Sequence, residues 1–419
     1  EQFRATVGLG GGSNNWALGP SKTGTGRPIL SNDPHLAPTL PPHWYLAHLT
    51  TPEWGIAGAC LAGSPGFASA HNGHVAWGVT AGLLDNTDLF IEEVGADGRS
   101  VREGNDFVPC EVHHELIEVK GGDPVVEDVI VTKRGPIVGP GLAHTEPSIS
   151  LAGTWLAPER VTSLLDTPRL TTVTAFRETV ARWHGPGLNM VLADDNGDIG
   201  WQMIGEIPQR KSGHGTLPLA GWDPNAGWED RYVDSARLPS AENPDAGYLA
   251  TANNRPTRDD EDPFLGVDWI EGYRISRIND LLAPRDDWDI SSTLHAQLDT
   301  VTNAWADLRE HVLGIGQRSS SAAAFALLRE WDGNMHRHSA AASVFVLWNT
   351  EMQRRVALAR APLSTAAALG RGFAPDLVTN SLFAFGRTSH LVRLLRDRPD
   401  GWFDDWDEEM AAALAVADA

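Results

Sequence analysis

The spacing of apolar positions divides the chain into a strand-rich first part and a helix-rich last part. Residues 13–94 hold short apolar runs separated by Gly, Pro and Asn-Asp, and residues 87–94 alternate with period two. Both patterns are typical of strands joined by tight turns. Residues 95–150 are more polar, with glycine-containing turns between further strands.

Helical spacing appears twice. Residues 158–183 carry apolar side chains three and four apart, and residues 185–210 then read as a hairpin with an Asp-Asn-Gly turn. From residue 274 onward helices dominate, and the spacing predicts one helix over 291–314. The fold class expected from this order is α+β.

Composition narrows the possible functions. The chain has 419 residues and a formal net charge of −22, which repels phosphate backbones and argues against nucleic-acid binding. No apolar run approaches the roughly 20 residues that a membrane helix needs. The start of the sequence lacks the basic and apolar regions of a signal peptide.

Several common catalytic and metal-binding signatures are missing. There is no G-x-S-x-G elbow, no Walker loop and no H-E-x-x-H pair. His113 and His114 are adjacent, which would place them on opposite faces of a strand and makes a shared metal improbable. Cys60 and Cys110 could form one disulfide or remain free thiols, and the sequence leaves both open.

What remains is a set of polar islands inside the apolar strands. They are GGGSNNWAL (10–18), SNDPHL (31–36), GSPGF (63–67), AHNGHVAWGVTAG (70–82), DNTD (85–88), TANNRP (251–256) and GYRISRI (272–278). Each island alone is a weak signal. In this order they resemble the penicillin acylase family of N-terminal nucleophile hydrolases, from the Gly-Ser junction to about residue 335.

The resemblance implies an αββα sandwich with a β-rich insertion and a helical C-terminal region. Residues 1–12 would be the end of a spacer, residues 13–273 the hydrolase core and residues 274–419 the mainly helical region. The family also has a small α-subunit from the same precursor and a β-rich C-terminal segment, so we expect this fold to be incomplete here. The resemblance further implies a periplasmic or extracellular protein.

Ser13 is the expected nucleophile. The glycines before it let another group approach the main chain closely, and the resemblance makes Gly12-Ser13 the self-cleavage junction. A serine hydroxyl needs a base to take its proton. A freed α-amino group has a reference pKa of about 7.7–8.0, so one residue can supply both nucleophile and base.

The resemblance assigns the remaining catalytic roles. The oxyanion donors would be the backbone N–H of Ala81 and the side-chain amide of Asn253, with Arg274 beside the nucleophile. His35 stands where cephalosporin and acyl-homoserine lactone acylases have histidine; a catalytic role and simple packing near the junction both remain open. The substrate pocket would include Leu36 and Trp155, and a leucine there favours an aliphatic acyl group over phenylacetyl.

The DNTD island suggests a structural calcium ion. Asp85 and Asp88 offer hard oxygen ligands three residues apart on one loop. The resemblance adds the carbonyl oxygens of Thr87 and Pro208, and a further ligand on the α-subunit. Solvated turn aspartates are the alternative interpretation, and no organic cofactor is expected.

The expected function is hydrolysis of a secondary amide of an N-acylated small molecule through an ester on Ser13. The alternative is a catalytically silent or unprocessed secreted protein of the same fold that binds acylated ligands. The N-terminal sequence of the purified large chain separates the two, because an active enzyme would begin Ser-Asn-Asn-Trp.

Overall fold

The computed structural model of the chain describes most of its length. The described residues are 11–36, 40–64, 66–139, 148–156, 163–258, 262–316, 321–370 and 387–418. Residues 1–10 of the expected spacer therefore lie outside the described part.

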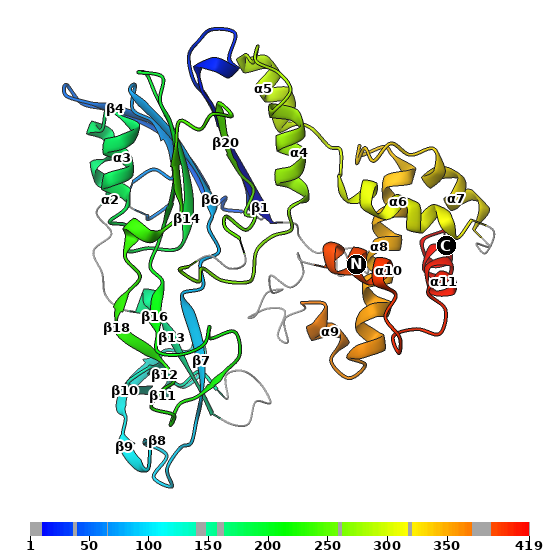
Figure 1. Cartoon of the computed structure of the whole chain (residues 1–419). Helices are drawn as coiled ribbons and strands as arrows, with labels where there is room; N and C mark the ends of the chain where they lie inside the picture. The colour runs from blue at the N-terminus through cyan, green and yellow to red at the C-terminus, as the bar shows by residue number, and fades with distance from the viewer. Residues whose placement is uncertain are drawn as a thin grey trace.

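Two β-sheets stack face to face in the upper left part of the view in Figure 1. In the described residues the larger sheet has seven strands, in the order β19 (Ser240–Glu242), β15 (Ile199–Ile204), β14 (Leu188–Asp194), β6 (Val75–Ala81), β5 (Ser69–His71), β4 (Gly55–Leu61) and β3 (Trp44–Thr50). The smaller sheet has three, in the order β2 (Ile29–His35), β1 (Gly12–Leu18) and β20 (Tyr248–Thr251).

Helices cover both outer faces of this pair of sheets (Figure 1). The larger sheet is covered by α3 (Val173–Val180), whose Phe176 packs with Trp77 of β6. The short helix α2 (Ser163–Asp166) and the 3-10 turn η3 (Thr167–Arg169) precede α3 within the region expected to be helical. The smaller sheet is covered by α4 (Tyr273–Leu282) and α5 (Ile290–Gln297).

The resulting layer order is helix, sheet, sheet, helix, which confirms the predicted αββα sandwich. The alternation of side chains along β1 explains how this strand serves two cores at once. Trp16 and Leu18 point outward and pack with the helix side of the smaller sheet, whereas Ala17 points inward and packs with Val191 and Ala193 of the larger sheet. By the same alternation, the Ser13 side chain belongs to the inner face, between the two sheets.

A β-rich lobe extends from one end of the sandwich (Figure 1). Its strands are β7 (Thr87–Glu92), β8 (Ser100–Glu103), β9 (Asp106–Pro109), β10 (Glu111–Ile117), β11 (Val125–Thr132), β12 (Gly135–Pro136), β13 (Ser148–Gly153), β16 (Pro208–Arg210), β17 (Leu219–Ala220) and β18 (Trp228–Tyr232). The 3-10 turn η2 (Thr154–Leu156) follows β13, and η4 (Ser235–Arg237) follows β18. The strands expected over 95–150 correspond to β8 to β13, and the lobe also takes in β7 and β16 to β18.

The last helices form a cluster with its own core. They are α6 (Ala304–Gly314), α7 (Ala322–Arg329), α8 (Ala340–Arg360), α9 (Thr365–Ala368), α10 (Thr388–Asp397) and α11 (Trp406–Asp418). The single helix predicted over 291–314 is wrong, because α5 ends at Gln297 and α6 begins at Ala304. In the break, the Asp299 carboxylate accepts from the Val301 N–H at 3.2 Å and from Arg277. A side chain that bonds the backbone locally competes with the helical pattern.

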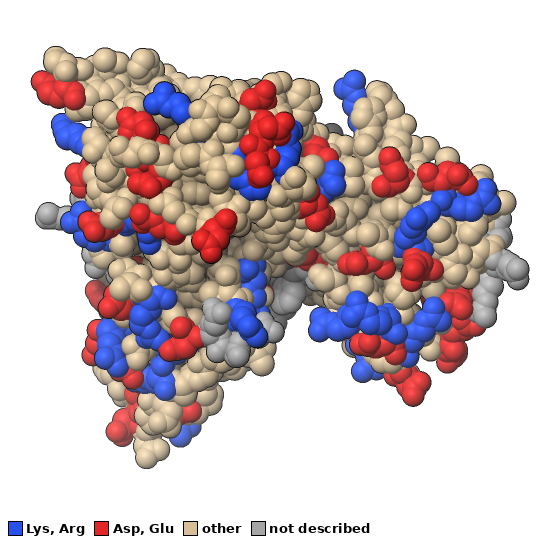
Figure 2. All heavy atoms as spheres, turned by 45° about the horizontal axis from the view of Figure 1, so that its top comes forward, with Lys and Arg blue, Asp and Glu red and all other residues tan. Residues whose placement is uncertain are grey.

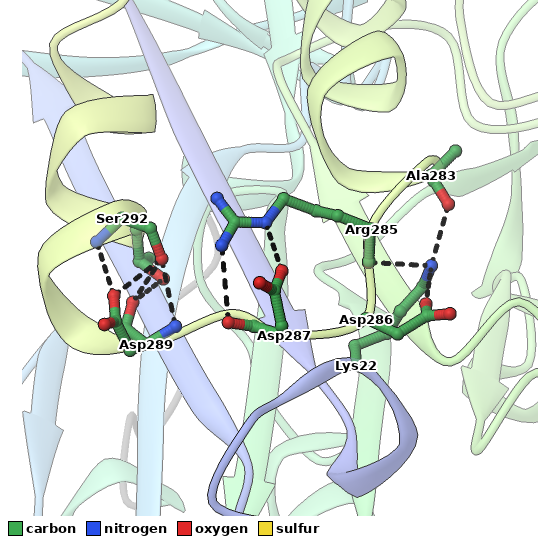
Figure 3. Close-up of polar contacts among 8 residues, drawn as sticks. Lys22, Ala283, Arg285, Asp286, Asp287, Asp289 and Ser292 are labelled. Carbon is green, nitrogen blue, oxygen red and sulfur yellow. Dashed lines mark hydrogen bonds and ion pairs between the residues drawn. The ribbon is translucent and has the colours of Figure 1, made fainter.

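Helix α4 is held at its C-terminal end by a buried lysine from the turn after β1. Lys22, in the 3-10 turn η1 (Pro20–Lys22), donates from Nζ to the carbonyl oxygens of Ala283 (2.8 Å) and Arg285 (3.2 Å), and contacts Asp286 at 2.7 Å (Figure 3). A cation near the last carbonyls of a helix satisfies acceptors that have no intrahelical partner. The turn between β1 and β2 is thereby tied to the connection between α4 and α5.

Other sequence expectations concern the surface and the cysteines. Cys60 and Cys110 are both free thiols and are partly buried. No helix in the described residues is long and apolar enough to cross a membrane. Acidic and basic side chains are interspersed over the face shown in Figure 2.

Candidate active site

Ser13 lies at the beginning of β1, at the edge of the space between the two sheets. Its residue is only 6% exposed. The hydroxyl Oγ donates to the carbonyl oxygen of Gly12 at 2.7 Å. The Ser13 oxygen is therefore already beside the carbonyl group of the peptide bond that the sequence predicts to be cut.

Asn253 reaches Ser13 from the segment after β20. The Ser13 N–H donates to Asn253 Oδ1 at 2.6 Å, and Asn253 Nδ2 donates to the carbonyl oxygen of Ala81 at 3.0 Å. The side chain is almost fully buried, and its backbone φ is 60°. Asparagine tolerates this left-handed conformation better than most residues, and such conformations persist where the surroundings hold them.

Arg274 enters the site from the first turn of α4. It donates from Nη1 to the Ser13 carbonyl (2.9 Å) and to Asn14 Oδ1 (2.7 Å). From Nη2 it donates to the Ala252 carbonyl (2.7 Å) and to Asn253 Oδ1 (3.0 Å). Burial lowers the pKa of the guanidinium, and the charge of Asp33 opposes that effect. Arginine remains charged at any ordinary pH, so a fixed cation lies beside the Ser13 main chain.

Steric contacts explain why residue 12 is a glycine. A Cβ at residue 12 would lie 2.9 Å from Arg274 Nη2. Because real Cβ contacts are longer than this, a side chain at position 12 would push the guanidinium away from the junction. The glycine therefore permits the close approach of Arg274. The sequence predicted a close approach of some group at this place but did not identify the group.

Two asparagines of the same strands support the site, and the sequence interpretation gave them no role. Asn14 Oδ1 holds Arg274, and Asn32 Nδ2 donates to the carbonyls of Asn14 and Val79, each at 2.9 Å. Asn32 thus joins the smaller sheet to β6 of the larger sheet. Both residues belong to polar islands, and that polarity within apolar strands was the available signal.

His35 lies at the end of β2, opposite Gly12 in the strand register. Its face of the strand is the outer one, shared with Asp33, whereas the Ser13 side chain points inward. His35 Nε2 is 2.9 Å from Asp33 Oδ2. His35, Asp33 and Arg274 help to line a cavity of about 310 Å³ on this outer face. The histidine is therefore close to the junction and paired with an aspartate.

The two expected pocket residues lie on different elements of the fold. Leu36 follows β2 directly and is about half exposed. Trp155 lies in η2 of the β-rich lobe, more than half exposed, and its Nε1 donates to Thr87 Oγ1 at 3.2 Å. A shared role of Leu36 and Trp155 in one acyl pocket stays a prediction.

The residues expected to bind calcium face an arginine. Arg210 Nη2 is 3.0 Å from Asp85 Oδ1 and 2.8 Å from Asp88 Oδ1, and Nε is 2.9 Å from Asp88 Oδ2. Burial raises the pKa of the Asp85 carboxyl, against the effect of the nearby Arg210 charge. Thr87 begins β7, and Pro208 is buried where β16 pairs with Tyr232.

This arrangement does not fit the predicted calcium ion. Calcium takes six to eight oxygen ligands, several of them carboxylates. The described residues contain no group of three or more His, Cys, Asp or Glu side chains suited to a metal. Both aspartates already turn toward Arg210, which lies two residues after Pro208 and had no role in the sequence interpretation.

Comparison with known proteins agrees with this architecture. The fold is similar to that of a thermostable penicillin G acylase from Alcaligenes faecalis, with a TM-score of 0.79 and 23% identity, over 96% of this chain and 77% of that one. The four-layer sandwich is therefore that of the N-terminal nucleophile hydrolases. Residues 2–419 match the Penicillin amidase family, and the chain belongs to this family.

Its relatives include acylases of two kinds. It is 33% identical to the penicillin acylase 2 proenzyme of Pseudomonas sp. strain SE83, over 99% of this chain and 54% of that protein. It is 29% identical to the acyl-homoserine lactone acylase QuiP of Pseudomonas aeruginosa, over 83% of this chain and 44% of that protein. The chain thus spans about half the length of the curated relatives that it matches.

Proposed function

We propose that the protein containing this chain is an acylase that hydrolyses the secondary amide of an N-acylated small molecule. The observation that carries the proposal is the contact of the Ser13 hydroxyl with the Gly12 carbonyl, beside Asn253 and Arg274. Membership of a family that includes acylases supports it. The silent binding protein is not favoured, because the residues needed for chemistry are present and joined by hydrogen bonds.

The first step is self-cleavage. The Ser13 Oγ attacks the Gly12 carbonyl carbon and its proton passes to the Ser13 nitrogen as the C–N bond breaks, so that an ester links Gly12 to the serine oxygen. Water then cleaves that ester and leaves Ser13 with a free α-amino group. That amine has a reference pKa of about 7.7–8.0. The positive charge of Arg274 favours its neutral form, which is the form that acts as a base.

The same atoms then act on the substrate. Oγ attacks the substrate carbonyl while its proton moves to the α-amine. The oxyanion would be bound by the Ala81 N–H and by Asn253 Nδ2, which already faces the end of β6. When the tetrahedral intermediate collapses, the amine of the substrate leaves and takes the proton from the Ser13 α-amino group. Water then hydrolyses the ester on Ser13 and releases the acid.

We further propose that a small α-subunit cut from the same precursor completes the protein. The name proenzyme given to one relative and the 54% coverage of that relative support this partner. The acyl group of the substrate is proposed to be aliphatic, because Leu36 is branched and not planar. Each additional methylene buried in the pocket should then strengthen acyl binding by about 0.8 kcal/mol. The hydrolysis rate should therefore rise with acyl chain length until the pocket is full.

The test uses the full-length precursor and its Ser13→Ala variant. The wild-type precursor should separate into two chains on a denaturing gel, with the larger beginning Ser-Asn-Asn-Trp. The variant should stay uncleaved, because the acyl shift needs the hydroxyl; normal cleavage of the variant would remove the basis of the proposal. A panel of acyl p-nitroanilides from acetyl to lauroyl, with phenylacetyl for comparison, tests the acyl preference of the mature enzyme.

A further inference from the structure

Arg210 is the centre of a buried polar cluster between the sandwich and the β-rich lobe. Its side chain is 5% exposed, that of Asp88 is fully buried and that of Asp85 is 20% exposed. Asp85 precedes β7, Asp88 lies within β7, and Arg210 is the last residue of β16. Arg210 and Asp88 are 122 residues apart in the sequence.

The oxygens around Arg210 are those that a hard cation would use. Nη2 donates to the Asp85 main-chain carbonyl at 3.2 Å as well as to Asp85 Oδ1 and Asp88 Oδ1. Two carboxylates and a main-chain carbonyl are ligands that calcium prefers. Here all three groups turn toward one guanidinium, so the place of a metal ion is taken by a side chain.

The carboxylate of Asp88 has no oxygen left for a metal. Oδ1 accepts from Arg210 Nε and Nη2, and Oδ2 accepts from Arg210 Nε and from Trp228 Nε1 at 2.6 Å. The planar guanidinium matches a carboxylate through paired hydrogen bonds, which are stronger than single neutral ones.

The neighbours hold the guanidinium in place. The Phe264 ring lies under it, with 5.9 Å between the guanidinium carbon and the ring centroid. Gly215 has a φ of +67°, and a Cβ there would lie 2.0 Å from Asp88 Oδ1 and 2.8 Å from Arg210 Nε. Residue 215 is therefore a position where only glycine admits this close approach.

We propose that Arg210 is a built-in cation that takes the place of calcium in this protein, so that its fold does not depend on the metal. The guanidinium cross-links β7, β16 and, through Asp88, Trp228 of β18. The proposal does not depend on the chemistry at Ser13, and its test measures thermal unfolding and calcium binding rather than activity.

The experiment compares the full-length protein with Arg210→Met and Arg210→Lys. The melting temperature Tm of the wild type should be unchanged by millimolar calcium chloride or by a chelator. Arg210→Met leaves two carboxylates without a cation and should lower Tm by about 3–6 °C. Calcium should restore part of that loss in Arg210→Met, whereas Arg210→Lys should keep a cation in place and show no calcium response.

Two further measurements make the result decisive. The double variant Arg210→Met/Asp88→Asn should lose the calcium response, because a carboxylate ligand is gone. Isothermal titration of the wild type with calcium should show no binding, and this measurement stands even if Arg210→Met does not fold. Calcium that binds the wild type and raises its Tm, with loss of both effects in Asp88→Asn, would overturn the proposal.

Discussion

The two ends of the Asn253 side chain have different partners, which fixes the orientation of its amide. Oδ1 accepts from Ser13 N and from Arg274, both of which can only donate. The NH₂ group must therefore be the end that faces Ala81. A donor is held there in advance of any substrate, which is the condition for stabilising an oxyanion without reorganisation.

The first prediction concerns this donor. Asn253→Ala should lower kcat of the mature enzyme about 10²–10³-fold with little change in KM, because the lost interaction forms fully only in the transition state. Steady-state kinetics with an aliphatic p-nitroanilide measures both constants. The matched control is Asn254→Ala, whose side chain bonds Ala252 N and the Arg255 carbonyl instead. A variant of Asn253 that raises KM alone would assign this residue to substrate binding.

The sequence predicted the site residues that lie in short motifs, but not those whose role comes from contacts between distant parts of the chain. Ser13, Ala81, Asn253 and Arg274 could be proposed because each lies in a short motif whose order is informative. The hydrogen bonds between them confirm that the fold brings these motifs together. Arg210 could not be predicted in this way, because its importance comes from a contact with Asp88 that no local pattern encodes.

At the scale of elements, α4 is fixed at both ends by cationic side chains. Arg274 binds the carbonyls of Ser13 and Ala252 at the start of the helix, and Lys22 of η1 binds carbonyls at its end (Figure 3). The apolar face of α4 packs on Trp16 between these two clamps. The position of Arg274 relative to Ser13 therefore depends on a helix that cannot easily slide.

The second prediction tests the clamp at the end of α4. Lys22→Met keeps the length of the side chain but leaves the Ala283 and Arg285 carbonyls without a donor. The free energy of unfolding should fall by about 1–3 kcal/mol, as measured by urea denaturation. Lys120→Met, at an exposed position in the turn between β10 and β11, is the control and should be neutral. Equal stability of the two variants would show that the hydrogen bonds of Lys22 do not stabilise the fold.

The break between α5 and α6 gives a prediction about pH. Hydrogen bonding to Arg277 lowers the pKa of the Asp299 carboxyl below its ordinary value. A lowered pKa in the folded state stabilises the protein above the unfolded pKa of about 3.9, and that contribution disappears as the pH falls through the folded value. Asp299→Asn should therefore be less stable than the wild type at neutral pH.

The difference between Asp299→Asn and the wild type should shrink on acidification below about pH 4. Urea denaturation at neutral and acidic pH measures it, and a difference that stays constant across this range would contradict the assigned pKa direction. The sequence interpretation missed this element boundary because helical spacing continues across residues 298–303. Only the side-chain bonds of Asp299, which depend on Arg277 of another helix, show why the helix stops.

At the scale of the molecule, β3 is an edge strand with an unusual surface. It ends the larger sheet and pairs with β4. Tyr45, Leu46 and Leu49 are 64%, 78% and 48% exposed. A long apolar edge strand in water is a site of uncontrolled strand pairing, and natural proteins usually cover it. The small α-subunit proposed above is the cover that we expect for this strand.

The last prediction follows from this expectation. In the full-length mature protein, the amides of β3 should exchange with deuterium as slowly as those of β4, because a covered edge has no N–H groups open to water. Leu46→Asp should then weaken the association of the two proposed subunits on size-exclusion chromatography, since a buried carboxylate without a partner is costly. Leu116→Asp is the matched control, because Leu116 is similarly exposed at 63% but lies on β10 of the β-rich lobe. Fast exchange along β3 together with normal assembly of Leu46→Asp would place the contact with the rest of the precursor elsewhere on the molecule.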